Sequence, residues 1–306
     1  MNNSIDSILS QISNVVIGKP KEIRLALACL LSRGHLLIED LPGMGKTTLA
    51  QALATSLGLS YQRTQFTSDL LPADIIGVSI FDQSTQSFSL HKGAIFNQVV
   101  LADEINRASP KTQSALLEAM EEKQVSIDGN TYDLPEPFFV IATQNPLFHA
   151  GTYPLPESQL DRFMMRLSLG FPDVEAEKAI LSSSDGREKI SELKVEITKE
   201  VLDEIQILVS QVNCSDAILE YVIALCHKSR DNTLKVNPLS PRAGKALLAA
   251  AKAWAYIEGR SYVIPEDIQA VFTPVCEHRL DAGNMESSDN TMSEQILKLV
   301  DPLKPF

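Results

Sequence analysis

The sequence lacks most features that mark membrane, secreted and zinc-binding proteins. Its 306 residues include only four cysteines, Cys29, Cys214, Cys226 and Cys276, and no two of them form a C-x-x-C pair. Scattered cysteines of this kind favour buried free thiols over a zinc site or a disulfide framework. No apolar run is long enough to cross a bilayer, and Met1–Ser4 does not start a signal peptide. We therefore expect a cytoplasmic protein with no stable membrane insertion.

Positive charge is also scarce. The chain has 27 Lys and Arg against 39 Asp and Glu, so its formal net charge is −12 and its pI is about 4.9. This balance, without any dense Lys/Arg run, argues against nucleic acid as a partner. A hydrophobic content of 44% is ordinary for a globular protein. The length predicts about two domains.

Residues 36–48 carry the most informative motif of the sequence. The apolar run Leu36–Glu39 ends in a tight turn with two glycines, and Lys46 and Thr47 then open an amphipathic helix. This is typical of a P-loop NTPase. Backbone N–H groups of residues 43–48 can converge on phosphate because glycine permits the turn, Lys46 can reach the β- and γ-phosphates, and the Thr47 hydroxyl can bind Mg²⁺. Asp40 departs from the usual pattern, which has glycine there.

Two further apolar strands end in polar side chains that suit this chemistry. Val99–Ala102 leads to Asp103 and Glu104. Asp103 fits the acid that holds Mg²⁺ on a neighbouring strand, and Glu104 could orient and deprotonate the attacking water. Residues 138–143 lead to Asn145, which could hydrogen-bond that water or the γ-phosphate. Taken alone, these side chains could also be solvated strand ends.

Two arginines are weaker candidates. Arg162 precedes the last predicted strand and could stabilise charge on the γ-phosphate of an adjacent subunit. The alternative is a surface salt bridge with Asp161. Arg242 opens a helix in the second half and could reach nucleotide from a lid, or could be a solvated cation in a first turn.

Strands alternate with helices in the first part of the chain, which predicts a parallel sheet covered on both faces. Two inserts read as hairpins, at residues 77–90 and 124–134, and the second contains an Asp-Gly turn signal. Strands are predicted at 35–39, 60–66, 99–103, 138–143 and 164–170.

Only helical patterns follow the polar break at Ser182–Arg187. Pro241 and Pro265 suit first helical positions, and Thr198 suits an N-cap. We predict an α/β core over residues 1–180 and an all-helical domain over 181–306. Its helices are expected at 199–212, 216–229, 241–257, 265–275 and 293–300.

Together these motifs resemble the MoxR family of AAA+ ATPases, from about Val15 to the end of the helical domain. The Asp-Glu-Ile-Asn-Arg-Ala stretch and its following helix are highly specific, and an acid at position 40 is familiar in this family. The stretches that carry the resemblance are Asp40–Thr47, Ala102–Ala108, Lys111–Met120, Ala142–Pro146 and Leu160–Phe163.

The resemblance implies an AAA+ P-loop core, with a parallel five-stranded sheet in the order 5-1-4-3-2 between helices, and a C-terminal all-helical lid. ATP and Mg²⁺ would be the cofactors, with Thr47 and Asp103 on the metal. Glu104 would complete the Walker B pair, Asn145 would be sensor 1, Arg162 the arginine finger and Arg242 sensor 2. The nucleotide-binding residues would be Val16, Ile17, Gly18, Pro42, Gly43, Met44, Gly45, Lys46, Thr47, Thr48 and Asp103.

The resemblance also implies a ring, expected to be a hexamer, with both hairpins facing its pore. Family members are chaperone-like and typically act with von Willebrand factor A domain proteins to mature or activate other proteins, sometimes by metal insertion. We expect such a partner to be a separate chain.

Three other functions remain open at this stage. A magnesium-chelatase-like motor subunit is a close cousin. A nucleic-acid motor is disfavoured because neither hairpin turn, Asp82–Gln86 or Asp128–Asn130, has a cation to hold phosphate. A nucleotide-gated scaffold that does not hydrolyse ATP is disfavoured by the intact Asp103-Glu104 pair.

Overall fold

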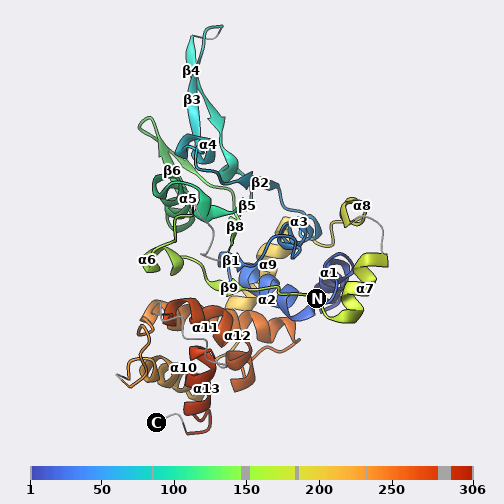
Figure 1. The fold of residues 1–306 in the computed structure, drawn as a ribbon, viewed down its shortest axis with the longest axis vertical. Coiled ribbons are helices and arrows are strands. Elements are labelled where there is room, and N and C mark those ends of the chain that lie inside the picture. The colour runs from blue at the N-terminus through green and yellow to red at the C-terminus, as the bar shows by residue number, and fades with distance from the viewer. Residues whose placement is uncertain are drawn as a thin grey trace.

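The structure is a computed structural model that describes residues 2–84, 86–145, 152–182, 186–231, 233–281 and 291–304. An α/β core carries two hairpins at one end and a group of helices at the other (Figure 1). None of the helices in the described ranges is long and apolar enough to cross a membrane. Part of the predicted linker, residues 183–185, lies outside the described residues.

Five parallel strands form the central sheet, in the order β2-β5-β8-β1-β9. Because these are the first to fifth strands of the core in chain order, the predicted order 5-1-4-3-2 is confirmed. β9 ends before the predicted Gly170 because the N–H groups of Leu169 and Gly170 donate to the Asp40 carboxylate and do not continue the ladder. The strands are β1 (Leu36–Glu39), β2 (Tyr61–Gln65), β5 (Val99–Asp103), β8 (Phe139–Gln144) and β9 (Met165–Leu167).

Each face of the sheet has its own helical cover, because successive side chains of a strand point to opposite faces. Leu36 and Ile38 of β1 pack in a hydrophobic cluster with α1, α2 and α3, whereas Leu37 packs in a second cluster with α5. Burial on both faces is the reason that β5 and β8 read as continuous apolar runs. The core helices are α1 (Asn2–Val15), α2 (Pro20–Leu31), α3 (Lys46–Ser56), α4 (Pro72–Ile76), α5 (Pro110–Glu122), α6 (Glu157–Leu160), α7 (Val174–Ser182) and α8 (Gly186–Ser191).

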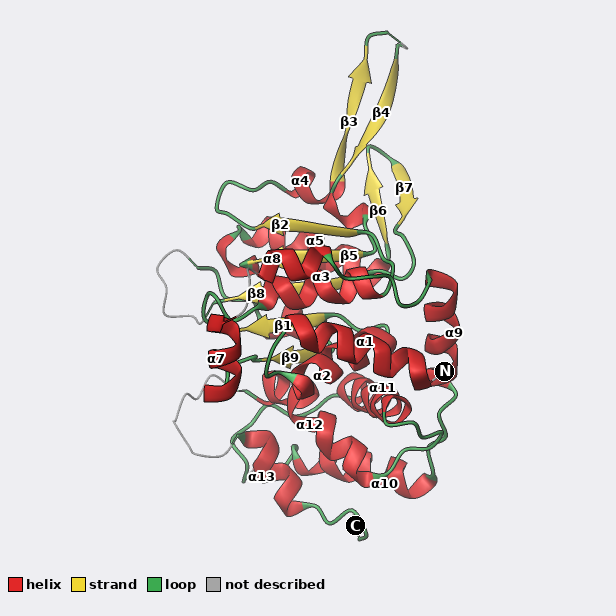
Figure 2. Cartoon of the chain, turned by 90° about the vertical axis from the view of Figure 1, so that its right-hand side faces the viewer, coloured by secondary structure: helices red, strands yellow, loops and turns green. Residues whose placement is uncertain are grey.

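Both predicted hairpins are present, and they project from the core at the end opposite the C-terminal helices (Figure 2). One pairs β3 (Gly77–Asp82) with β4 (Ser87–Lys92), and the other pairs β6 (Gln124–Ile127) with β7 (Asn130–Asp133). Asp128 and Gly129 between β6 and β7 both have positive φ, 50° and 82°. Two positive values are what a type I′ turn requires, so the Asp-Gly signal is explained.

The C-terminal helices form the predicted helical region. Helix α11 begins at Pro241 as expected, and the Ser240 hydroxyl accepts a hydrogen bond from the Ala243 N–H at 3.2 Å. Thr198 precedes α9, but its side chain makes no capping bond to that helix. Helix α12 continues past the predicted end at Val275 because its last turn is held against the core. These helices are α9 (Lys199–Ser210), α10 (Asp216–Lys228), α11 (Pro241–Ile257), α12 (Pro265–Leu280) and α13 (Met292–Leu299).

That last turn of α12 joins the helical region to the core. The Arg279 guanidinium, only 7% exposed, donates to the Asp161 carboxylate at 2.7 Å and to the Phe163 carbonyl at 2.9 Å. His278 beside it, with burial lowering its pKa, lies 3.1 Å from the same Phe163 carbonyl through Nε2. These bonds act on the segment that leads directly into β9.

The segment after residue 180 packs back against the core. The Glu196 N–H donates to the Ser56 carbonyl at 2.9 Å, and Gln11 of α1 bonds the backbone of Lys194. The predicted boundary at residues 180 and 181 stays a prediction, but residues 194–196 lie with the core helices.

His35, immediately before β1, is a buried neutral histidine. The Val140 N–H donates to its Nδ1 at 3.0 Å, so Nε2 carries the proton and faces the Met120 carbonyl at 3.4 Å. Burial lowers the pKa of His35 to about 4, and the charge of Lys123 acts in the same direction.

We predict that this histidine makes the fold acid-sensitive. Its folded-state pKa lies below the ordinary 6.5, so the unfolded chain takes up the proton first as pH falls. The contribution to stability is therefore present above pH 6.5 and is lost between pH 6.5 and 4. His35→Asn keeps an acceptor for Val140 and should reduce the loss of unfolding free energy between pH 7 and 5 by about 2 kcal/mol.

Urea unfolding at several pH values measures this difference. His91→Asn, which removes an exposed histidine, is the matched control and should keep the wild-type pH dependence. Equal pH dependence in His35→Asn and wild type would show that His35 does not titrate differently in the folded state.

Candidate functional site

The predicted phosphate loop, residues 40–47, connects β1 to α3 at the carboxyl edge of the sheet. Gly43 and Gly45 have φ of 88° and 87°, in the region that favours glycine, and a Cβ added to either would meet no atom within 4 Å. The space beside both glycines is therefore open. Backbone N–H groups at the start of α3 can turn toward an anion there.

Asp40 fixes the base of the loop. Its carboxylate accepts hydrogen bonds from the Ser168 hydroxyl at 3.0 Å, from the Leu169 N–H and from the Gly170 N–H at 3.3 Å. The side chain therefore ties β1 to the end of β9. A glycine at this position, as in the general P-loop pattern, could not do so, which gives the departure at Asp40 a structural reason.

Lys46 lies within the loop and is buried. Its ammonium donates to the Asp40 carbonyl at 2.6 Å and lies 3.5 Å from Asn145 Oδ1. Burial lowers the pKa of Lys46, and the nearby carboxylates of Asp40, Asp103 and Glu104 partly offset that effect. The lysine thus points to the place where the predicted acids converge.

Asp103 ends β5, the strand next but one to β1, and β8 lies between them. Both carboxylate oxygens are engaged. The Thr143 hydroxyl donates to Oδ1 at 2.6 Å, and Arg63 of β2 donates to Oδ2 through Nε at 3.1 Å and Nη2 at 2.6 Å. Asp103 is therefore held in one orientation at the carboxyl edge.

Glu104 leaves the strand in a left-handed conformation, with φ of 57°, and its N–H donates to the Thr143 hydroxyl at 2.9 Å. Its carboxylate accepts from Asn145 Nδ2 and from Gln65 Nε2, both at 2.9 Å, and pairs with Arg107 at 3.1 Å. The predicted Walker B and sensor 1 residues thus touch one another, and through Asn145 they reach Lys46.

Val16, Ile17 and Gly18 lie between α1 and α2, against α7. Gly18 has φ of 76°, and a Cβ there would come within 2.5 Å of Ala176 Cβ. Lys19 donates to the Phe171 carbonyl at 2.8 Å. This segment is therefore fixed beside the chain that follows β9.

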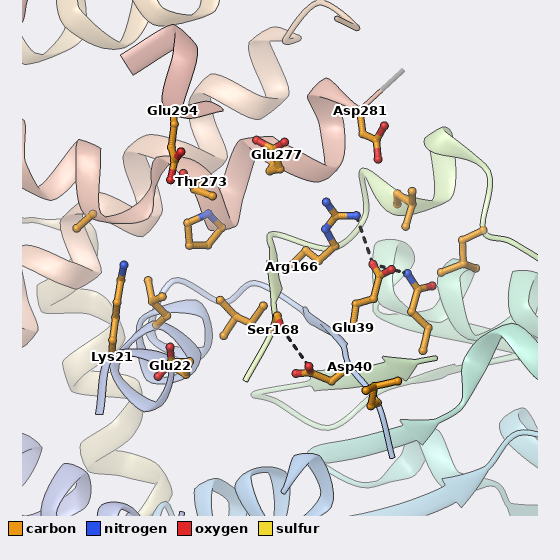
Figure 3. Close-up of a pocket in the computed structure, with 18 of the residues that line it drawn as sticks. Lys21, Glu22, Glu39, Asp40, Arg166, Ser168, Thr273, Glu277, Asp281 and Glu294 are labelled. Carbon is orange, nitrogen blue, oxygen red and sulfur yellow. Dashed lines mark hydrogen bonds and ion pairs between the residues drawn. The ribbon is translucent and has the colours of Figure 1, made fainter. Parts of the chain in front are cut away.

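A cavity of about 760 Å³ opens beside the phosphate loop, between the core and helices α12 and α13 (Figure 3). On the core side Glu39 pairs with Arg166 at 3.3 Å, and on the helical side Glu277 and Glu294 line the cavity. Its described lining reaches Asp40 and Leu41 but does not include Lys46, Thr47 or Asp103. The cavity adjoins the phosphate loop and is not itself the phosphate site.

The two candidate arginines lie elsewhere, at the amino edge of the sheet. Arg162 precedes β9 and pairs with Glu121 of α5 at 3.0 Å, not with Asp161. Arg242 of α11 lies 3.5 Å from the other oxygen of Glu121 and 3.7 Å from Asp161. The structure thus brings Arg162 and Arg242 together, but it does not bring Arg242 to the phosphate loop of its own chain.

Comparisons with known proteins agree with this fold. The chain matches the model of the ATPase family associated with various cellular activities (AAA) over residues 35–165, and that of the AAA lid domain over residues 229–299. The uncharacterized protein YeaC of Bacillus subtilis is 47% identical over 95% of this chain and 91% of its own length. Chaperone MoxR1 of Mycobacterium tuberculosis is 36% identical over 97% of this chain and 82% of its own length.

A solved structure is similar over nearly the whole chain. The crystal structure of a protein from Cytophaga hutchinsonii that is assigned as an ATPase superposes with a TM-score of 0.88 at 37% identity, and it covers 98% of this chain and 95% of that one. The sheet order and these matches make the chain an AAA+ ATPase. Within that class it belongs to the MoxR family, because its similarity to Chaperone MoxR1 extends over nearly its whole length.

Sequence reasoning gave no role to several residues that contact the predicted site, among them Arg63, Gln65, Arg107, Glu121 and Thr143. Arg63 and Gln65 carried a usable signal, since polar side chains at alternate positions of a strand lie on one face. Glu121 and Thr143 carried none, because their partners come from other elements.

We predict that Asp40→Ala destabilises the chain by about 2 kcal/mol, because the buried N–H of Leu169 loses its acceptor. Asp40→Asn keeps one acceptor oxygen and should be milder. Asp40→Gly should be no more stable than Asp40→Ala, although it restores the general P-loop pattern. Urea unfolding measures all three. Asp133→Ala, which removes an exposed acid of β7, should stay near wild type, and an equal loss there would refute the assigned role of Asp40.

Proposed function

We propose that this MoxR-family ATPase works as a cytoplasmic ring of six copies that hydrolyses Mg·ATP between subunits and remodels a protein client. One observation carries the proposal: the phosphate loop and the acids lie at one edge of the sheet, and Arg162 and Arg242 lie at the other. A complete site then needs two copies of the chain.

At the carboxyl edge, the residues present fit ATP and Mg²⁺. Loop N–H groups and Lys46 would hold the phosphates, and the Thr47 hydroxyl and Asp103 carboxylate are oxygen ligands of the kind that Mg²⁺ prefers. When bound, Mg²⁺ neutralises charge on the β- and γ-phosphates. Glu104 would take the proton of the attacking water, and Asn145, 2.9 Å from Glu104, would orient that water.

Val16, Ile17 and Gly18 would lie by the adenine. Val16 is 5% exposed and belongs to the hydrophobic cluster, so the core anchors this segment. The close approach of Gly18 to Ala176 holds it against α7. Pro42, Met44 and Thr48 would complete the nucleotide contacts through the loop backbone.

Both arginines lie away from the phosphate loop of their own chain. β1 alone spans four residues, about 13 Å at 3.3 Å per residue, and Arg162 lies beyond its amino end. In a head-to-tail ring, the amino edge of one copy faces the carboxyl edge of the next. Arg162 and Arg242 would then approach the γ-phosphate of the neighbour, and that phosphate would take the place of Glu121.

The hairpins would meet the client. Phe81 and Phe88 face each other across β3 and β4 with ring centroids 5.2 Å apart, and they are 50% and 74% exposed. Exposed aromatic pairs of this kind suit transient contact with unfolded or flexible protein. A von Willebrand factor A domain protein would be the separate partner, and client maturation could include metal insertion.

Two variants separate nucleotide binding from turnover. Lys46→Ala should lose tight ATP binding, because the cation that neutralises the phosphates is removed. Glu104→Gln should bind ATP with wild-type affinity and hydrolyse it at least about 100-fold more slowly, because the water loses its base. Fluorescent-nucleotide titration and a phosphate-release assay measure the two effects. Wild-type turnover in Glu104→Gln would contradict the role of Glu104.

A mixing experiment tests the arrangement in trans. Arg162→Ala should bind ATP normally but hydrolyse it about 10³-fold more slowly or worse, the usual effect of an arginine finger. Mixed with Lys46→Ala, which keeps its finger, it should recover part of the activity that neither variant has alone. Arg24→Ala, which breaks an exposed ion pair with Glu258, is the matched control and should stay active.

No recovery in any mixture, although both variants still assemble, would rule out the trans arrangement. If Arg162→Ala alone hydrolyses ATP at the wild-type rate, Arg162 is no arginine finger and its contact with Glu121 is a surface ion pair. In wild type, activity per subunit should rise with protein concentration, because dilution separates finger from phosphate.

The hairpins give the last prediction. Phe88→Ala should leave basal ATPase at the wild-type rate and reduce the client retained by a Glu104→Gln trap. Tyr132 of β7 packs on the second hydrophobic cluster, so Tyr132→Ala should instead lower stability, by about 2 kcal/mol. If the trap that also carries Phe88→Ala retains as much client as the Glu104→Gln trap alone, this hairpin does not contact the client.

A further inference from the structure

Arg63 makes a contact that no step of the proposed reaction uses. It extends from β2, and its guanidinium places two N–H groups on one oxygen of Asp103, at 3.1 and 2.6 Å. This is a charge-assisted pair at short range, the strong form of such a contact. Asp103 is the predicted metal ligand, so the arginine occupies the coordination position of a cation.

The second oxygen of Asp103 also has a partner. The Thr143 hydroxyl donates to Oδ1 at 2.6 Å, while Arg63 places both of its N–H groups on Oδ2 and so covers the side on which a cation would bind that oxygen. A guanidinium and Mg²⁺ on that oxygen would place two positive charges within a few ångströms of each other, and their repulsion disfavours the binding of both at once. Binding of one cation therefore favours release of the other.

We propose that Arg63 is an internal counter-ion of Asp103 that is exchanged for Mg²⁺ when nucleotide binds. The inference rests on the proposed Mg·ATP site. Arg63 is a positioning residue: it keeps the carboxylate paired in the nucleotide-free chain and thereby sets the Mg²⁺ concentration at which the site fills.

The surroundings of Arg63 suit such an exchange. Its side chain is 50% exposed, whereas that of Asp103 is 11% exposed, so the arginine can move into solvent while the acid stays in place. β2 is the edge strand of the sheet, and within the described part of the chain no further strand lies beyond it to confine Arg63. Gln65, two residues on, accepts from Nη2 at 3.3 Å and can guide the released side chain.

A counter-ion is needed because the acids lie close together. Glu104 follows Asp103 directly in the chain. Among the described residues, Arg63 is the only cation that bonds the Asp103 carboxylate. Lys46 does not replace it, since its ammonium bonds the Asp40 carbonyl. Mg²⁺ prefers oxygen ligands and a guanidinium is weakly hydrated, so exchange favours the metal once phosphates supply its remaining ligands.

Metal affinity tests the exchange without reference to turnover. Mn²⁺ serves as a paramagnetic probe of the Mg²⁺ position, and free Mn²⁺ is measured by electron paramagnetic resonance with the full chain and a non-hydrolysable ATP analogue. Arg63→Met should bind Mn²⁺ about tenfold more tightly than wild type, because the competing charged hydrogen bonds are gone. Affinity for the analogue without metal should be unchanged.

Two further variants complete the experiment. Arg24→Met makes the same change of net charge at an exposed ion pair far along the chain, and it should have wild-type Mn²⁺ affinity. Arg63→Lys keeps the charge but cannot place two N–H groups on one oxygen in the guanidinium geometry, so it should bind Mn²⁺ more tightly than wild type and less tightly than Arg63→Met. It also replaces Arg63→Met if that variant fails to fold.

The outcomes are distinct. Unchanged or weaker Mn²⁺ affinity in the folded Arg63 variants, with normal binding of the analogue, overturns the exchange and leaves the proposed site intact. Failure of the wild type to bind the analogue overturns the nucleotide site and the exchange together.

Discussion

Every strand of the central sheet runs in the same direction, and the rest of the molecule depends on that constraint. Parallel strands gather their carboxyl ends at one edge, so the loop after β1, the acids after β5 and the asparagine after β8 meet there. The segment that enters β9 must lie at the opposite edge, and it carries Arg162. A chain of this topology holds the parts of the proposed ATP site on two separate edges, and in the proposed ring a second copy joins them.

The C-terminal helical region shares its hydrophobic core with the α/β core. Helix α2 packs on the sheet and on α11, so one hydrophobic cluster runs from the core into the C-terminal helices. Arg279 and His278 bond the segment that leads into β9, and Asp40 bonds the segment that leaves it. β9 is therefore held at both ends, between the helical region and the phosphate loop. Bonds from α12 and bonds from the phosphate loop therefore meet at the two ends of this short strand.

Most charged side chains of the described site are paired with other side chains of the same chain. Asp103 is bonded to Arg63, Glu104 to Arg107 and Asn145, and Arg162 and Arg242 share Glu121. These acids and arginines thus each have a partner of opposite charge within the chain, whereas Lys46 bonds a backbone carbonyl. Such pairing lowers the energy of partly buried charges and holds them near their working positions. Nucleotide and neighbour would then act by exchanging partners.

The sequence by itself determined the elements and the chemistry at their ends. Apolar runs with polar tips predicted β1, β5 and β8, and composition predicted β2 and β9. The glycine turn before Lys46 predicted the phosphate loop, and Asp128-Gly129 predicted a hairpin, because these signals are local. Only the tertiary structure decided who pairs with whom: Asp40 with residue 169, Arg63 with Asp103, and Glu121 with both arginines. It also carried α12 from the predicted end at Val275 to Leu280, since the last turn is buried and bonded against the core. Contacts between residues 40 to 130 positions apart have no local signature, and they follow from how the strands are ordered in the sheet.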